Sequence, residues 1–144
     1  MTLKNIDDAF IATLNKGSIA WLRIAVGIVF FWFGALKVIG QSPVAALVAD
    51  TYSFFPAHGF LVLLGLWEML IGIGLLFKLS LRVTLGLLWL QMLGTLVAPL
   101  LNPKIFFMHG NPLLLTTEGE FVVKNLVLIA AGLVIGGHEV KKRI

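Results

Sequence analysis

The chain has 144 residues, of which 59% are hydrophobic and only 12% are charged, and its mean hydropathy is +1.00. A water-soluble domain of this size keeps a largely charged surface, so the composition excludes that class and predicts one integral membrane domain over residues 1–144. The absence of cysteine excludes a disulfide, a thiol nucleophile and a thiolate metal site in this chain.

The first apolar run, from Ser18 to Gly40, is too long for a cleavable signal peptide, and no small-residue cleavage site follows it. We therefore expect it to remain as the first membrane span, preceded over residues 1–17 by a short amphipathic helix at the membrane interface. Small and polar residues recur in this span at steps of four, three, four and three. They share one helix face, which should face the other spans: Arg23, Gly27, Phe30, Gly34 and Lys37.

Residues 41–57 connect the first two spans. Ser42 is suited to cap a helix and Pro43 to form its first turn. These signals predict a short helix over Val44–Phe55 that lies at the membrane surface and ends before Pro56.

The second span, over about residues 58–77, contains a carboxylate near its middle, Glu68. A charge at that depth costs roughly 3 kcal/mol or more unless it is neutralised or paired. Gly65 and Gly72 share a helix face with Glu68, and small residues there let another helix approach closely. We therefore expect Glu68 to face the interior of a helical bundle.

The third span covers about residues 80–101, and its small or polar face consists of Ser80, Thr84, Leu87, Gln91, Gly94 and Ala98. Residues 102–117 are expected to form a loop, and the last span should cover about residues 118–137. In that span Gly132 and Gly136 form a small-xxx-small pair, suited to packing within the bundle or to a homo-oligomer contact. The sequence thus predicts an all-α fold, a bundle of four transmembrane helices with a short interfacial helix between the first two spans.

Basic residues indicate the orientation. Most of them lie in the N-terminal segment, the turn between the second and third spans, and the tail: Lys4, Lys16, Lys78, Arg82, Lys141, Lys142 and Arg143. The two longer loops carry only Lys104. Because cytoplasmic loops carry the excess of basic residues, both termini are expected in the cytoplasm. This tail suits anionic lipid headgroups, and no nucleic-acid partner is expected because no basic helix face with interleaved aromatic residues accompanies it.

Polar residues from different spans are expected to meet in the outer half of the bundle. Counted from the outer helix ends, Glu68 and Gln91 lie about 15 Å deep, Lys124 about 9 Å and Lys37 about 5 Å. Arg23 lies near the opposite end. Two interpretations remain open: these groups only hold the helices together, or they line an outward-facing pocket for a small polar or amphipathic molecule.

Trp32, Trp67 and Trp89 lie well inside their spans rather than at the membrane interfaces. They are either core residues or a flat surface for a quinone-like ring. No two histidines face each other from mid-membrane positions, and the sequence contains no metal-ligand spacing, phosphate loop or nucleophile elbow. The sequence therefore predicts no metal site and identifies no catalytic residue.

Three stretches resemble the DoxX-like family of small four-helix membrane proteins: Leu22–Lys37, Leu64–Gly72 with its Gly-x-x-Glu pair, and Glu118–Asn125. The likeness covers about residues 18–137. It implies a bundle in a bacterial inner membrane, with loose kinship to the small membrane subunit of thiosulfate:quinone oxidoreductase and to a membrane family linked to reactive-chlorine resistance. By this analogy, the polar positions typical of the family are Arg23, Lys37, Glu68, Lys124 and Asn125.

The superfamily also looks similar to eukaryotic cargo receptors and receptor-assembly chaperones, so kinship in fold does not fix the chemistry. The resemblance implies an accessory, non-catalytic subunit of a quinone-linked redox or oxidant-defence system, with a redox partner protein. A small molecule, with a quinone as the candidate cofactor, would bind in the outward-facing cavity against Lys37, Glu68, Gln91, Lys124, Asn125, Trp32, Trp67 and Trp89. The alternatives are a membrane assembly factor or scaffold for a partner protein, and a small transporter.

Overall fold

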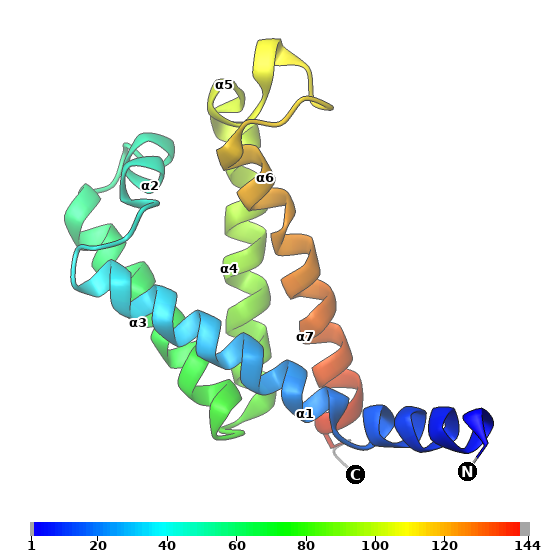
Figure 1. Ribbon diagram of the computed structural model, residues 1–144. Coiled ribbons are helices and arrows are strands. Elements are labelled where there is room, and N and C mark those ends of the chain that lie inside the picture. Colours follow the sequence, from blue (N-terminus) through cyan, green and yellow to red (C-terminus); the bar gives the residue numbers. More distant parts are fainter. Residues whose placement is uncertain (1, 142–144) are drawn as a thin grey trace.

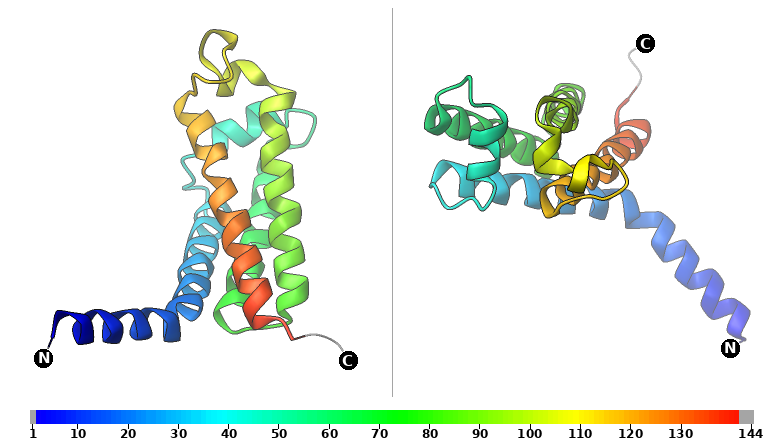
Figure 2. Two further views of the ribbon diagram at one scale, coloured as in Figure 1. Left: turned by 90° about the vertical axis from the view of Figure 1, so that its right-hand side faces the viewer. Right: turned by 90° about the horizontal axis from the view of Figure 1, so that it is seen from above.

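The computed structural model describes residues 2–141, which form helices joined by short connections (Figures 1 and 2). Four segments are long and apolar enough to cross a membrane: α1 (Leu3–Val38), α3 (Ala57–Leu76), α4 (Leu81–Leu101), and α6 (Thr117–Val123) together with α7 (Asn125–Glu139). The shorter elements are α2 (Ala45–Thr51), α5 (Pro103–Phe106) and the single turn η1 (Met108–Gly110). No β-strand occurs in residues 2–141, so the predicted all-α bundle with four spans is confirmed.

Glycines bring α1 and α3 together along most of the span (Figure 1). A Cβ atom added at Gly34 would lie 2.5 Å from the carbonyl oxygen of Gly65, and one added at Gly72 would lie 2.5 Å from the amide nitrogen of Phe31. These distances are too short for any side chain, so the two backbones are in direct contact. The predicted inward face of the first span is confirmed, because all five of its residues are buried: Arg23, Gly27, Phe30, Gly34 and Lys37.

The second pair consists of α4 and α7. Gly132 packs against the indole ring of Trp89, and Gly136 packs against Leu85. The small-xxx-small pair is therefore used within the chain. The fully buried side chains of the core lie mainly in the half of the spans that is nearer the termini: Ile71, Leu75, Leu85, Leu88 and Ile135.

The two pairs meet at the end of the molecule where both termini lie, and they separate toward the end that carries α2 and α5 (Figure 1). The predicted helix over residues 1–17 is part of α1, and residues 2–16 are exposed. Figure 2 shows this dark blue segment running away from the bundle, across the direction of the spans. Lys142 and Arg143 of the predicted basic tail lie outside the described residues.

The connection between the first two spans differs from the prediction. The helix α2 covers only seven residues, its N-cap is Val44, and Ser42 makes no side-chain cap. It ends early because the aromatic run after it folds back onto the start of α3. The ring centroids of Phe55 and Phe60 lie 4.8 Å apart, and those of Tyr52 and Phe60 lie 5.4 Å apart.

The second long connection is more ordered than the predicted loop. It contains α5 and η1, and residues Phe107 and Leu115 form an isolated antiparallel bridge. The hydroxyl of Thr116 then accepts a hydrogen bond from the backbone N–H of Gly119 at 3.1 Å, which caps the first turn of α6.

Candidate functional site: a cavity between the two helix pairs

A cavity of about 410 Å³ lies between the α1/α3 pair and the α4/α7 pair, in the half of the bundle opposite the termini. It exists because the pairs diverge there, and α2 lies across its end. Most of its wall is apolar and comes from Val29, Phe30, Phe33, Val44, Leu47, Val48, Phe60, Leu63, Leu64, Leu90, Met92, Phe121, Val122 and Leu128. Cavities of this size and lining are typical of sites for small organic molecules.

Three polar side chains from three spans meet on the wall of this cavity. The ammonium nitrogen of Lys37 lies 2.6 Å from Oε2 of Glu68, and the side-chain amide of Gln91 donates a hydrogen bond to Oε1 of the same carboxylate. Glu68 is only 8% exposed and Lys37 only 7%. A cation and an amide therefore compensate the carboxylate, as its depth in the membrane requires.

This cluster still has hydrogen-bonding capacity to offer a ligand. An ammonium group has three N–H donors, and Lys37 uses one of them on Glu68. The side-chain oxygen Oε1 of Gln91 is buried, and no group in residues 2–141 donates a hydrogen bond to it. Both Lys37 and Gln91 line the cavity, so its polar wall can supply donors and an acceptor to the same bound molecule.

Two further polar contacts border the cavity. The side-chain amide of Asn125 donates to the hydroxyl of Thr95 at 3.1 Å, which joins α7 to α4. The phenol of Tyr52, just after α2, donates to the backbone carbonyl of Gly94 at 2.6 Å. Burial raises the pKa of Tyr52. Its hydrogen bond to Gly94 ties the end of α2 to α4 beside the cavity.

The three tryptophans have different surroundings. Trp67 lines the cavity, and its indole N–H donates to the carbonyl oxygen of Leu87 at 3.2 Å. Trp89 instead packs between α4 and α7, where a Cβ atom at Gly132 would lie 2.8 Å from its indole nitrogen. Trp32 is 62% exposed on the outer face of α1. The prediction that Trp89 and Trp32 line the cavity is therefore wrong.

The placement of Lys124 in the cavity is also wrong. Its side chain is 74% exposed, and its nearest carboxylate is that of Glu120, at 4.0 Å. The physical reason is direction around the helix: Lys124 has helical backbone angles between α6 and α7, and it lies on a different face from the cavity-lining residues Phe121, Asn125 and Leu128. The neighbouring Asn125 lines the cavity, whereas Lys124 points to its outside.

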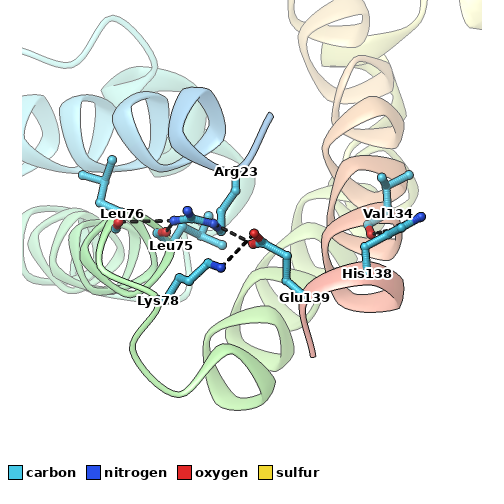
Figure 3. Close-up of polar contacts among 7 residues, drawn as sticks. All are labelled: Arg23, Leu75, Leu76, Lys78, Val134, His138 and Glu139. Atoms are coloured by element: carbon cyan, nitrogen blue, oxygen red, sulfur yellow. Dashed lines mark hydrogen bonds and ion pairs between the residues drawn. The ribbon is translucent and has the colours of Figure 1, made fainter. Parts of the chain in front are cut away.

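A second polar cluster, which the sequence did not predict, lies at the opposite end of the bundle (Figure 3). Arg23 donates to the carbonyl oxygens of Leu75 and Leu76, and its Nε lies 2.6 Å from Oε2 of Glu139. Lys78 adds a second cation, with its nitrogen 3.0 Å from Oε1 of Glu139. The cluster joins α1, the last turn of α3 and the end of α7, and we call it the Arg23 cluster.

A signal for the Arg23 cluster was present in the sequence. An arginine close to one membrane face needs a partner there, and Glu139 follows the predicted end of the last span by two residues. Within the described residues, no three histidine or acidic side chains gather closely enough to hold a metal ion.

Comparison with known proteins identifies no relative of this chain. No family model matches the chain, and neither do the curated proteins nor the solved structures.

Proposed function

We propose that this protein binds an amphipathic small molecule with a quinone-like headgroup in the cavity, and that it serves as an accessory, non-catalytic subunit of a quinone-linked redox or oxidant-defence system. One observation carries the proposal. A largely apolar cavity of about 410 Å³ is bordered by the buried polar cluster of Lys37, Glu68 and Gln91. If the cluster only held the helices together, side chains would fill the space beside it. The cavity there supports a ligand instead.

The chemistry of a quinone headgroup suits this wall. Its carbonyl oxygens accept hydrogen bonds, which the free N–H groups of Lys37 can donate. In the reduced form the ring hydroxyls become donors, and the unpartnered oxygen of Gln91 or the carboxylate of Glu68 can accept them. The ring of Trp67 supplies a flat apolar surface beside the same site.

The resemblance to the DoxX-like family and the chain's own chemistry support the accessory role. The sequence has no cysteine, so it offers no thiol to exchange electrons with a bound ring. A redox partner protein would reduce or oxidise the quinone, and this chain would hold the headgroup and supply Lys37, Glu68 and Gln91 as proton or hydrogen-bond partners.

We place the protein in a bacterial inner membrane with both termini in the cytoplasm. The termini lie at the same end of the bundle, together with the turn between α3 and α4 (Figure 1). Lys78 lies in this turn, and Arg82 lies in the first turn of α4. The opposite end carries α2, α5 and Lys104. The excess of basic residues on one side supports this orientation, and the cavity then lies in the outer half of the membrane.

Purification with native lipids, followed by chromatography of an organic extract, tests the proposal. We expect a quinone to accompany the native protein and Glu120→Gln, whose carboxylate is exposed, but not Glu68→Gln. Because both variants remove one carboxylate, a loss of quinone in Glu68→Gln alone shows that the cavity cluster is needed, and not simply the overall charge. An extract without any quinone contradicts the proposed function.

An assembly factor or scaffold is the second candidate, and one observation favours it. The first part of α1 projects from the bundle, and its apolar residues Leu3, Ile6, Phe10 and Leu14 are exposed. Crosslinking in membranes distinguishes the candidates, since a scaffold would capture the same partner protein in the native chain and in Glu68→Gln. A small transporter has less support, because the Arg23 cluster closes the end of the bundle opposite the cavity.

A further inference from the structure

The cavity borders the surrounding lipid along the gap between α3 and α4. Two residues on its wall are also widely exposed on the outer surface of these helices, Leu63 on α3 and Leu90 on α4, each 58% exposed. Gly94 belongs to the same wall and is exposed as well. The polar wall at Glu68 is thus connected to hydrocarbon without passing through the core.

Two hydrogen bonds frame this gap. At one end the indole of Trp67 donates to the carbonyl of Leu87 at 3.2 Å, and at the other end the phenol of Tyr52 donates to the carbonyl of Gly94 at 2.6 Å. Leu87 and Gly94 are seven residues apart on α4, or about 10 Å. Both contacts end on backbone carbonyls, and between them Gln91 of α4 bonds to Glu68 of α3 across the same gap. The open part of the gap therefore lies between Gln91 and Gly94.

Gly94 adds free space to this open part of the gap. A Cβ atom added there would meet no heavy atom within 4 Å. The other side of the cavity is bordered by Phe33 of α1 and Phe121 of α6, which are also exposed, but their bulky rings take up space that Gly94 leaves free. The carbon atoms of an alkyl or prenyl chain need about 4 Å from neighbouring carbons, which the gap beside Gly94 provides.

We propose that the gap between α3 and α4 is a lateral window, through which the cavity takes its ligand from the bilayer and through which the ligand's alkyl or prenyl tail extends into the lipid. The inference rests on the proposed function for the identity of the headgroup, and it adds the chemical class of the whole ligand. The ligand is a membrane-dissolved molecule with a polar ring or head at Glu68 and a long hydrocarbon tail beside Gly94. A water-soluble small molecule is not the ligand of this site.

An alkyl diazirine dissolved in liposomes tests the window without any quinone. On illumination it reacts with nearby carboxyl groups, and Glu68 is too buried to meet it from the lipid except through the cavity. We expect modification of Glu68 in the native protein, scored by peptide mass spectrometry. In Gly94→Phe we expect about tenfold less modification of Glu68, because the ring closes the window. A tenfold change corresponds to about 1.4 kcal/mol in the free energy of probe binding in the cavity.

Gly86→Phe is the matched control. Gly86 is also an exposed glycine of α4 with open space around its missing side chain, but it does not line the cavity. Modification of Glu68 should be unchanged there. Equal modification in native protein and Gly94→Phe overturns the window, as does an absence of modification in the native protein. Window-dependent modification in a protein that carries no quinone keeps the window and rejects the proposed headgroup.

Discussion

The two ends of the bundle each contain a buried acid with basic partners, yet they are built differently. At the closed end, Arg23 donates to the last carbonyls of α3 and forms an ion pair with Glu139, so its guanidinium group is held on both sides by the protein itself. At the open end, Lys37 bonds only Glu68, and the oxygen of Gln91 has no partner within residues 2–141. The cavity adjoins only the cluster at the open end. Two sets of ionic residues inside one membrane protein can therefore have different roles.

The difference assigns the two clusters to different tasks. The Arg23 cluster fastens α1, α3 and α7 where the core is tightest, and the turn beyond it is held in addition by Arg82, which donates to the carbonyl of Lys141. The cluster at Glu68 lies where the pairs diverge. We therefore expect substitutions at the closed end to change stability most, and substitutions at the open end to change ligand binding most.

The largest loss of stability is expected from Arg23→Met. It removes the more buried of the two cations on Glu139 and leaves two carbonyl oxygens without their donor, each at a cost of about 1–3 kcal/mol, so the free energy of unfolding should fall by about 3–4 kcal/mol. Thermal unfolding in detergent measures this loss. Arg82→Met is the control, because Arg82 lies at the same end on the exposed surface. Equal losses in the two variants would mean that the Arg23 cluster has no special structural role.

A smaller loss is expected from Lys37→Met. It leaves Glu68 with Gln91 and with the option of taking up a proton, so we expect a loss of about 2 kcal/mol. The double variant Lys37→Met, Glu68→Met should recover most of this stability, since it leaves no buried charge unpaired. If the double variant is no more stable than the single one, the two side chains are not coupled in the way the 2.6 Å contact indicates.

A change in binding with little change in stability is expected from Gln91→Leu. The leucine fills a similar volume but removes a donor to Glu68 and the free acceptor of the cavity wall. Quenching of tryptophan fluorescence by an added quinone should show affinity lower by about tenfold, the worth of one buried hydrogen bond. Gln41→Leu, an exposed position outside the cavity, should bind as the native protein does. Unchanged binding by Gln91→Leu would remove Gln91 from the site.

The smallest effect is expected from Tyr52→Phe. It keeps the ring and its contacts with Phe60 but loses the hydrogen bond to Gly94, which should cost about 1 kcal/mol. The loss should be local. Hydrogen exchange should rise in α2 and in the turn after it, with no change at the closed end. Uniform exchange across the four spans would show that Tyr52 supports the whole bundle rather than the cover of the cavity.

The sequence predicted the spans well, because each is an apolar run bounded by polar or proline residues. The second span, expected over 58–77, is Ala57–Leu76 in the structure. The inward face of the first span was also predictable, since Gly27 and Gly34 recur at helical spacing with Arg23 and Lys37. The proximity of Lys37, Glu68 and Gln91 followed from their depths and from the need to compensate a buried charge.

The errors have one origin: depth along a helix does not give direction around it. Trp32 and Trp89 have suitable depths, yet one faces outward and the other faces α7. Lys124 also has a suitable depth, but it lies on a different face of the last span from Asn125, which lines the cavity. Glu139 was missed because the last span extends two residues past its expected end, which brings the carboxylate to the level of Arg23.

A density map of the protein purified with native lipids tests the role of the cavity most directly. We expect density for a ring within hydrogen-bonding distance of Lys37 or Gln91, continuous with a tail that leaves between α3 and α4 beside Gly94. An empty or collapsed cavity, or a Glu68 carboxylate turned away from Lys37 toward lipid, would contradict a ligand site in this part of the bundle.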